Sequence, residues 1–169
     1  CLMHPLDKGL RDGLQKLALS LDETQIARLL GYLDLIQKWT KVYNLTAVRD
    51  PAEMLTHHLL DSLAVIAPLR RQLESMGLGG KPVRLLDVGS GAGLPGVVIA
   101  VCCPDIAVHC VDTVAKKAAF IQQVAVSLKL PNLRGIHARV ESLTEPYDVV
   151  SSRAFASLVD FVTWSEKAL

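Results

Sequence analysis

The residues that could do chemistry are concentrated in one glycine-rich stretch, RLLDVGSGAGLPG, at 84–96. An apolar run ends near Asp87, glycines follow at alternate positions, and a second apolar segment begins. Part of this stretch fits the pattern G-x-G-x-x-G through Gly91, Gly93 and Gly96. Asp112 lies 21 residues after Gly91, the separation at which dinucleotide-binding loops place a carboxylate for a ribose. One interpretation is therefore a nicotinamide-type dinucleotide site.

The same glycines also fit D-x-G-x-G-x-G, through Asp87 followed by Gly89, Gly91 and Gly93. This pattern resembles the S-adenosylmethionine loop of class I methyltransferases. We prefer it because a dinucleotide loop would begin only at Gly91, after Asp87 and further residues. A carboxylate beside the loop also suits a cationic ligand better than a pyrophosphate.

The physical reason for glycine here is close approach of the backbone to a ligand, since glycine has no Cβ atom. S-adenosylmethionine carries no phosphate, so loop carbonyls and Asp87 are expected to face its amino group and sulfonium. Asp112, at the end of the next apolar run, is expected to accept hydrogen bonds from both ribose hydroxyls.

Four short apolar runs, separated by helical stretches, must position these residues. They are expected strands at Val83–Val88, Ala107–Val111, Leu133–Ile136 and Tyr147–Val150. Continuous apolar strands joined by helical crossovers predict an α/β fold, a parallel sheet covered by helices on both faces. We expect a helix after the fourth strand and an open sheet edge beside that strand.

The first 80 residues have a helical pattern. Leucines at intervals of three and four predict a helix over 6–19, and Ser20 with Glu23 predicts a capping box that starts a long helix through Tyr43. Further helices are expected at Asp50–Ala67 and Leu69–Met76, before a glycine-rich linker. We therefore divide the chain into a helical extension, 1–80, that packs on a catalytic domain, 81–169.

Composition excludes several classes of protein. Half of the 169 residues are apolar, which argues against disorder, and a net charge of +1 argues against a protein coated with basic residues. The longest uncharged run, Val88–Pro104, contains four Gly and two Pro, which argues against a membrane span. The four cysteines have no metal-binding spacing with histidine and are typical of reduced core residues. We expect a cytoplasmic protein without a metal or a membrane partner.

Several longer segments resemble one family, the bacterial 16S rRNA guanine-N7 methyltransferases, also called glucose-inhibited division protein B. These segments are KWTKVYNLTAVRDPAEML (38–55), HHLLDSL (57–63), LLDVGSGAGLPGVVIA (85–100), VDTVAKKAAFIQQV (111–124) and SSRAFASL (151–158). The resemblance runs through nearly the whole chain. It implies a class I, Rossmann-like methyltransferase that uses S-adenosyl-L-methionine and releases S-adenosyl-L-homocysteine.

The resemblance also implies site residues. It adds Gly89, Leu94, Val140, Glu141 and Arg153 to the cofactor residues already named, which are Asp87, Gly91, Gly93 and Asp112. Arg153 belongs to the SRAFA segment at the carboxyl end of the fourth strand, where such sheets hold active-site groups. We assign it the catalytic role of positioning the reactants.

The chemistry of guanine N7 explains why no general base is named. N7 has an in-plane lone pair and no proton, so it can attack a sulfonium methyl group directly in line. N7 also lies on the major-groove edge, which is deep and narrow in an RNA helix, so a loop or flipped guanine is the expected target. The resemblance implies a 16S rRNA hairpin loop near the decoding site.

Some basic and polar residues flank the matched motifs and could contact RNA of the 30S subunit. They are Asn44, Arg49 and Lys117. Two other functions stay open at this point: a nicotinamide-linked oxidoreductase, and a non-catalytic RNA-binding factor in ribosome assembly. Methyltransferases of this class usually have seven strands, so with four counted we expect C-terminal strands to be missing from this sequence.

Overall fold

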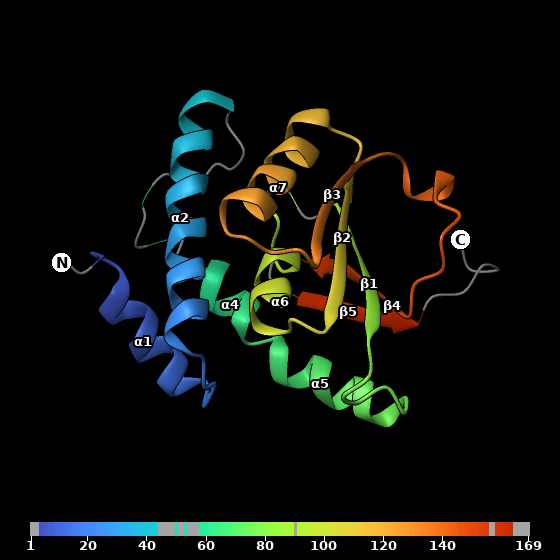
Figure 1. Ribbon diagram of the computed structural model, residues 1–169, viewed down its shortest axis with the longest axis horizontal. Coiled ribbons are helices and arrows are strands. Elements are labelled where there is room, and N and C mark those ends of the chain that lie inside the picture. Colours follow the sequence, from blue (N-terminus) through green and yellow to red (C-terminus); the bar gives the residue numbers. More distant parts are fainter. Residues whose placement is uncertain are drawn as a thin grey trace.

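The computed structural model describes the backbone of residues 4–43, 50, 53, 58–89, 91–155 and 158–163 (Figure 1). Side chains are described for 4–42, 50, 53, 58–89 and 91–151. Within these ranges, helices and a mixed sheet form an α/β structure.

The centre of the molecule is a five-stranded sheet in the order β3-β2-β1-β4-β5. The strands are β1 (Val83–Val88), β2 (Ile106–Asp112), β3 (Leu133–His137), β4 (Val149–Phe155) and β5 (Leu158–Thr163). The first four are parallel to one another, and the register pairs Asp87 of β1 with Cys110 of β2 and with Ser151 of β4. The predicted parallel α/β sheet is confirmed, and β1 has the predicted bounds.

The expectation of an open edge beside the fourth strand was wrong. β5 pairs antiparallel with β4, along the segment where we expected a helix. Its sequence, LVDFVT, is rich in β-branched and aromatic residues, and the free backbone groups of β4 offer it hydrogen-bond partners. The local pattern was thus ambiguous between helix and strand, and pairing with β4 decided it.

Helices cover one face of the sheet. α6 (Gly96–Cys102) and α7 (Ala115–Ser127) lie directly on it, and α2 (Glu23–Tyr43) forms an outer layer over both (Figure 1). Residues from these helices and from the strands belong to one apolar core. The side chains of Leu85 and Val108 point into this core from neighbouring strands.

We predicted helices on both faces of the sheet, but the second face is covered by a loop segment instead. Among the described residues it carries the segment 138–148, with one short 3-10 turn, η2 (Val140–Ser142) (Figure 1). Leu86, Val111, Tyr147 and Val150 form a second, smaller apolar cluster there. The strand pattern alone could not distinguish a covering helix from a covering loop, since either buries apolar side chains.

The N-terminal helices are α1 (Asp7–Lys16) and α2, followed by α4 (Leu60–Leu63) and α5 (Ile66–Ser75). We expected one helix to continue through Ala67, but the helical path breaks at Ala64 and Val65. Pro68 explains the position of the break, because its ring would clash with the carbonyl four residues earlier, at Ala64, in a continuous helix. Proline is tolerated in the first turn of α5 instead.

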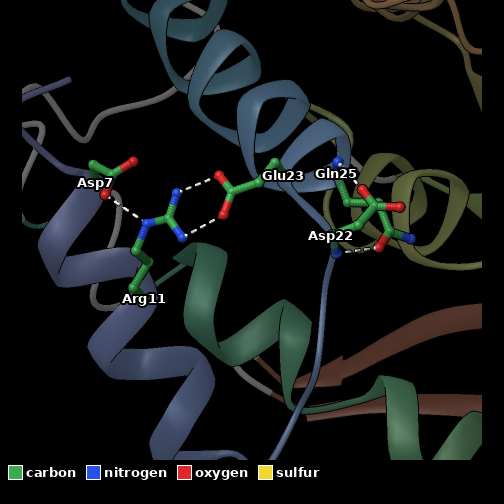
Figure 2. A network of polar contacts seen from close by, with 5 residues as sticks. All are labelled: Asp7, Arg11, Asp22, Glu23 and Gln25. Carbon is green, nitrogen blue, oxygen red and sulfur yellow. Dashed lines mark hydrogen bonds and ion pairs between the residues drawn. The ribbon is translucent and has the colours of Figure 1, made fainter. Parts of the chain in front are cut away.

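The capping box at the start of α2 is formed by other residues than predicted (Figure 2). The Gln25 backbone N–H donates to Asp22 Oδ1 at 2.7 Å, and the Asp22 backbone N–H donates to Gln25 Oε1 at 3.0 Å. Ser20 and Glu23 have the same spacing, but Asp22 is the residue immediately before the helix. The N-cap is therefore Asp22, and Glu23 is free for another role.

That role is an ion pair between α1 and α2 (Figure 2). Arg11 donates two hydrogen bonds to the Glu23 carboxylate, at 2.9 and 2.6 Å, and a third to Asp7 Oδ1 at 2.7 Å. The Arg11 guanidinium lowers the pKa of Glu23 below its ordinary value. The bidentate geometry fixes the angle between the first two helices more than it adds stability, because the pair is exposed.

The cysteines that the structure describes, Cys102, Cys103 and Cys110, are buried and not in disulfides. Burial raises the pKa of the Cys102 thiol to about 12, so this thiol stays protonated. The prediction of thiol core residues is confirmed for these three. Among the described helices, none combines the length and the apolar character needed to cross a membrane.

Candidate active site

The glycine-rich loop begins where β1 ends, at Val88. Gly89, Gly91 and Gly93 have φ angles of +63°, +62° and +102°, a region that residues with a Cβ atom rarely adopt. A Cβ atom added at Gly89 or Gly91 would have no atom within 4 Å, so the space beside the loop is open there. The chain turns at the first glycine of D-x-G-x-G-x-G, which supports that pattern over a loop starting at Gly91.

Gly96 has a different role from Gly89 and Gly91. A Cβ atom there would lie 2.5 Å from both Asp87 Oδ2 and Cys110 Sγ. Both of those side chains are buried. Gly96 therefore allows α6 to approach the sheet closely, which is a packing requirement.

Asp87 lies beneath the loop and is only 2% exposed. Its Oδ2 atom accepts a hydrogen bond from the Gly96 backbone N–H at 2.9 Å, and its Oδ1 atom accepts one from the Ser151 hydroxyl at 2.7 Å. The carboxylate thus connects β1, β4 and the start of α6. A buried carboxylate is tolerated because it is hydrogen-bonded on both oxygens.

A pocket of about 420 Å³ opens at the carboxyl ends of β1, β2 and β3. This is within the range of small-molecule sites, and it lies where parallel sheets bind ligands. Four predicted cofactor residues line it together: Gly89, Asp112, Val140 and Glu141. They come from the loop after β1, the end of β2 and the turn η2.

Asp112 is held in place by its own turn. One carboxylate oxygen, Oδ1, accepts a hydrogen bond from the Val114 backbone N–H at 2.8 Å. The neighbouring strand ends are joined by a bond from the Gly89 N–H to the Val111 carbonyl, at 3.0 Å. His137 Nε2 lies 3.1 Å from the Thr113 carbonyl oxygen, so β3 also supports this turn. The half-buried carboxylate therefore enters the pocket from a fixed backbone.

Other predicted site residues do not line the pocket. Leu94 is 4% exposed and belongs to the apolar core, and Gly91 and Gly93 lie in the loop before α6. Lys117 is half-buried in the first turn of α7, which begins just after Asp112. Arg153 lies in β4, two residues before its end, and its side chain is outside the described residues. Asn44 and Arg49 also lie outside them.

Sequence reasoning missed five residues that line the pocket as part of a cofactor site. They are Val88, Val111, Thr113, Ala138 and Arg139. Each lies at, or within two residues of, the carboxyl end of a strand. Position at a strand end was the available signal, because that edge of a parallel sheet forms the ligand site. No cluster of three or more potential metal ligands occurs in the part of the chain that the structure describes.

Comparison with known proteins identifies the family of this chain. The model of the family described as rRNA small subunit methyltransferase G matches residues 25–169. A protein of Albidiferax ferrireducens named "Ribosomal RNA small subunit methyltransferase G" is 69% identical, across 99% of this chain and 77% of its own length. A protein of the same name from Polaromonas sp. strain JS666 is 66% identical, across 96% of this chain and 72% of its own length.

A solved structure of coclaurine N-methyltransferase, bound to N-methylheliamine and SAH, is much more distant. Its sequence is 17% identical to this one, the match covers 85% of this chain and 53% of the coclaurine N-methyltransferase chain, and the TM-score is 0.41. The assignment rests instead on the family model and on the two close relatives. The chain belongs to the rRNA small subunit methyltransferase G family.

Proposed function

We propose that this chain transfers a methyl group from S-adenosyl-L-methionine to N7 of a guanine in a 16S rRNA loop near the decoding site. Family membership supports one part of the proposal, methyl transfer to rRNA of the small subunit. It also favours methyl transfer over nicotinamide-linked oxidation. The position on the base comes from the resemblance of the motifs and from the chemistry of guanine. An enzyme of this kind would meet ribosomal subunits in the cytoplasm.

The pocket fits S-adenosyl-L-methionine, the cofactor of this family. A carboxylate at Asp112 suits two ribose hydroxyls, and the loop at Gly89 and Gly91 leaves open space for close approach. Val140 and Glu141 also line the pocket, and we place the adenine beside them. Leu94 and Gly93 do not line the pocket, and we propose that they shape the loop from its packed side.

Asp87 acts mainly through the loop in this proposal. Its two oxygens hold Gly96 and Ser151, so the carboxylate fixes the turn and adds negative charge beneath it. That charge favours the cationic amino and sulfonium groups over a pyrophosphate. When bound, the cofactor supplies an electrophilic methyl group.

The reaction needs orientation more than proton transfer. Guanine N7 attacks with a lone pair and has no proton to lose, so we assign no general base. Holding the attacking nitrogen, the methyl carbon and the sulfur in line can lower the barrier by up to roughly 7–11 kcal/mol. We place Arg153 beside the reactants because β4 adjoins β1 and ends at the edge of the sheet that carries the pocket.

Contacts with RNA are proposed at the same edge. Lys117 follows the end of β2 closely and could bind a phosphate. On the sequence motifs alone, we also propose Arg49 and Asn44 as RNA contacts. The partner is proposed to be the 30S subunit, since the target loop is part of its RNA.

The test is direct detection of the product on its natural substrate. 30S subunits from a bacterial strain lacking this modification are incubated with the protein and S-adenosyl-L-methionine, and their RNA is digested to nucleosides. Mass spectrometry should show 7-methylguanosine, at close to one per subunit, mapped to one loop. Asp112→Ala, assayed at a low cofactor concentration, should give much less.

Three other results would contradict the proposal at different levels. A different methylated nucleoside would show that the position is wrong while the class of reaction is right. Binding to 30S subunits without methyl transfer would favour the assembly factor. Binding of NADH without binding of S-adenosyl-L-homocysteine would favour an oxidoreductase.

A further inference from the structure

One face of α2 sends three side chains to main-chain carbonyl groups of the catalytic fold. Gln25 Nε2 donates to the Val101 carbonyl at 3.1 Å, and Arg28 Nε donates to the Leu128 carbonyl at 3.0 Å. Tyr32 donates its hydroxyl hydrogen to the Ala92 carbonyl at 2.6 Å. Spacings of three and four residues place all three on the same face of the helix. Only the Tyr32 contact, among these three, ends in the glycine-rich loop.

The Tyr32 contact is buried on both sides. Tyr32 is 0% exposed and Ala92 is 8% exposed, so water does not replace this hydrogen bond if it is lost. The centroid of the Tyr32 ring lies 6.4 Å from that of the Phe120 ring in α7. This ring contact holds the Tyr32 side chain independently of its hydroxyl. The hydroxyl oxygen would also lie 3.3 Å from a Cβ atom at Gly93. A side chain at this position would therefore crowd the hydroxyl, and glycine leaves the room that the hydroxyl occupies beside the loop.

The loop needs such a contact because of its composition. Ala92 lies between Gly91 and Gly93, both at positive φ, and glycine has more backbone conformations to lose than any other residue. A loop that is already ordered loses less conformational entropy when a ligand binds. A fixed carbonyl at Ala92 restricts both glycines at once.

We propose that Tyr32 is a positioning residue for the cofactor: its hydroxyl holds the Ala92 carbonyl and keeps the loop in its binding conformation. This inference rests on the proposed cofactor site. It gives the N-terminal helices a role in cofactor affinity in addition to packing. It assigns no chemical step to Tyr32.

The test removes one oxygen atom. Tyr32→Phe keeps the ring against Phe120, so the fold should be retained, as circular dichroism and thermal unfolding would check. The dissociation constant of S-adenosyl-L-homocysteine, measured by calorimetry, should rise about threefold to tenfold, the equivalent of one neutral hydrogen bond. KM for S-adenosyl-L-methionine should rise similarly, while kcat at saturation stays within about twofold.

Arg28→Met is the matched control. It removes two side-chain-to-carbonyl hydrogen bonds, to Leu128 and Lys129, from the same face of α2 but at the far end of α7. It should lower the unfolding temperature and leave the affinity for S-adenosyl-L-homocysteine unchanged. Hydrogen exchange of backbone amides over 89–96 should accelerate in Tyr32→Phe and not in Arg28→Met.

The outcomes separate the two proposals. If the wild-type protein binds no S-adenosyl-L-homocysteine, the proposed function fails. If the wild type binds and Tyr32→Phe binds equally well, with unchanged exchange over 89–96, the positioning role is overturned. Equal weakening in Tyr32→Phe and Arg28→Met would also overturn it, because the effect would then come from general destabilisation.

Discussion

Two carboxylates at the ends of neighbouring strands have opposite environments. Asp87 is buried and its oxygens are occupied by Gly96 and Ser151, whereas Asp112 is half-buried and lines the pocket. Sequence motifs alone mark both as acidic residues near a glycine loop. Burial and hydrogen bonding separate a residue that shapes the loop from one that can reach a ligand.

Asp112→Ala should weaken binding of S-adenosyl-L-homocysteine by about 10- to 100-fold, the loss expected when hydrogen bonds to a charged group, roughly 1.5–3 kcal/mol, are removed. Isothermal titration calorimetry would measure it. Asp105→Ala, just before the other end of β2, is the control and should bind as tightly as the wild type. Unchanged affinity in Asp112→Ala would argue against the ribose contact.

Gly96→Ala should destabilise the protein by about 1–3 kcal/mol, because the added methyl group would overlap Asp87 Oδ2 and Cys110 Sγ. Urea unfolding would show this as a lower midpoint. Adding Cys110→Ala should restore part of the loss, since it removes one of the two clashing atoms. A wild-type midpoint for the single variant would mean that α6 can move away from the sheet at little cost.

Helix ends in this chain depend on small differences between adjacent residues. Ser20 and Asp22 both have a suitable partner three residues later, yet α2 starts after Asp22. Glu23 then pairs with Arg11 and joins α1 to α2. Pro68 similarly sets the break before α5 from four residues away. These boundaries follow from local chemistry combined with one tertiary contact.

Asp22→Ala should lower the free energy of unfolding by about 1 kcal/mol, the usual cost of losing an N-cap side chain. Ser20→Ala, at an exposed position outside the helix, should change it by less than about 0.5 kcal/mol. Chemical denaturation of both variants gives the comparison. A larger effect at Ser20 would restore the capping box that the sequence suggested.

The whole molecule places its site by the order of its strands. The chain adds β2 and β3 on one side of β1 and β4 on the other, so the end of β1 is where the connections diverge. α2 packs across α6 and α7 and contributes Tyr32 to the same core (Figure 1). The second face has its own apolar cluster, and His109 Nδ1 of β2 lies 2.8 Å from the hydroxyl oxygen of one member, Tyr147.

The buried His109 beside this cluster lets us predict how the stability of the protein depends on pH. Burial lowers the pKa of His109 below its ordinary value near 6.5, so the folded protein keeps a neutral ring while the unfolded chain takes up a proton. Stability is therefore complete above about pH 6.5 and falls as the pH drops through the lowered pKa. His109→Asn should show a smaller fall in unfolding temperature between about pH 7.5 and 5.

The control for this prediction is His137→Gln, at an exposed histidine in β3. Its unfolding temperature should fall with acidification as in the wild type. If His109→Asn also keeps the wild-type fall, the acid sensitivity originates elsewhere in the molecule.

Periodicity and glycine spacing were sufficient for the parallel sheet, the bounds of β1, the loop after it and the acidic end of β2, because each depends on residues close together in the chain. The pairing of β5 and the covering of the second face depended on contacts between distant segments, whereas the starts of α2 and α5 were missed although local capping and Pro68 explain them. The different environments of Asp87 and Asp112, and the hydrogen bond from Tyr32 in α2 to Ala92, also depended on the tertiary structure. Hydrogen bonds across 60 or more residues have no periodic signature, so only the folded arrangement could place them.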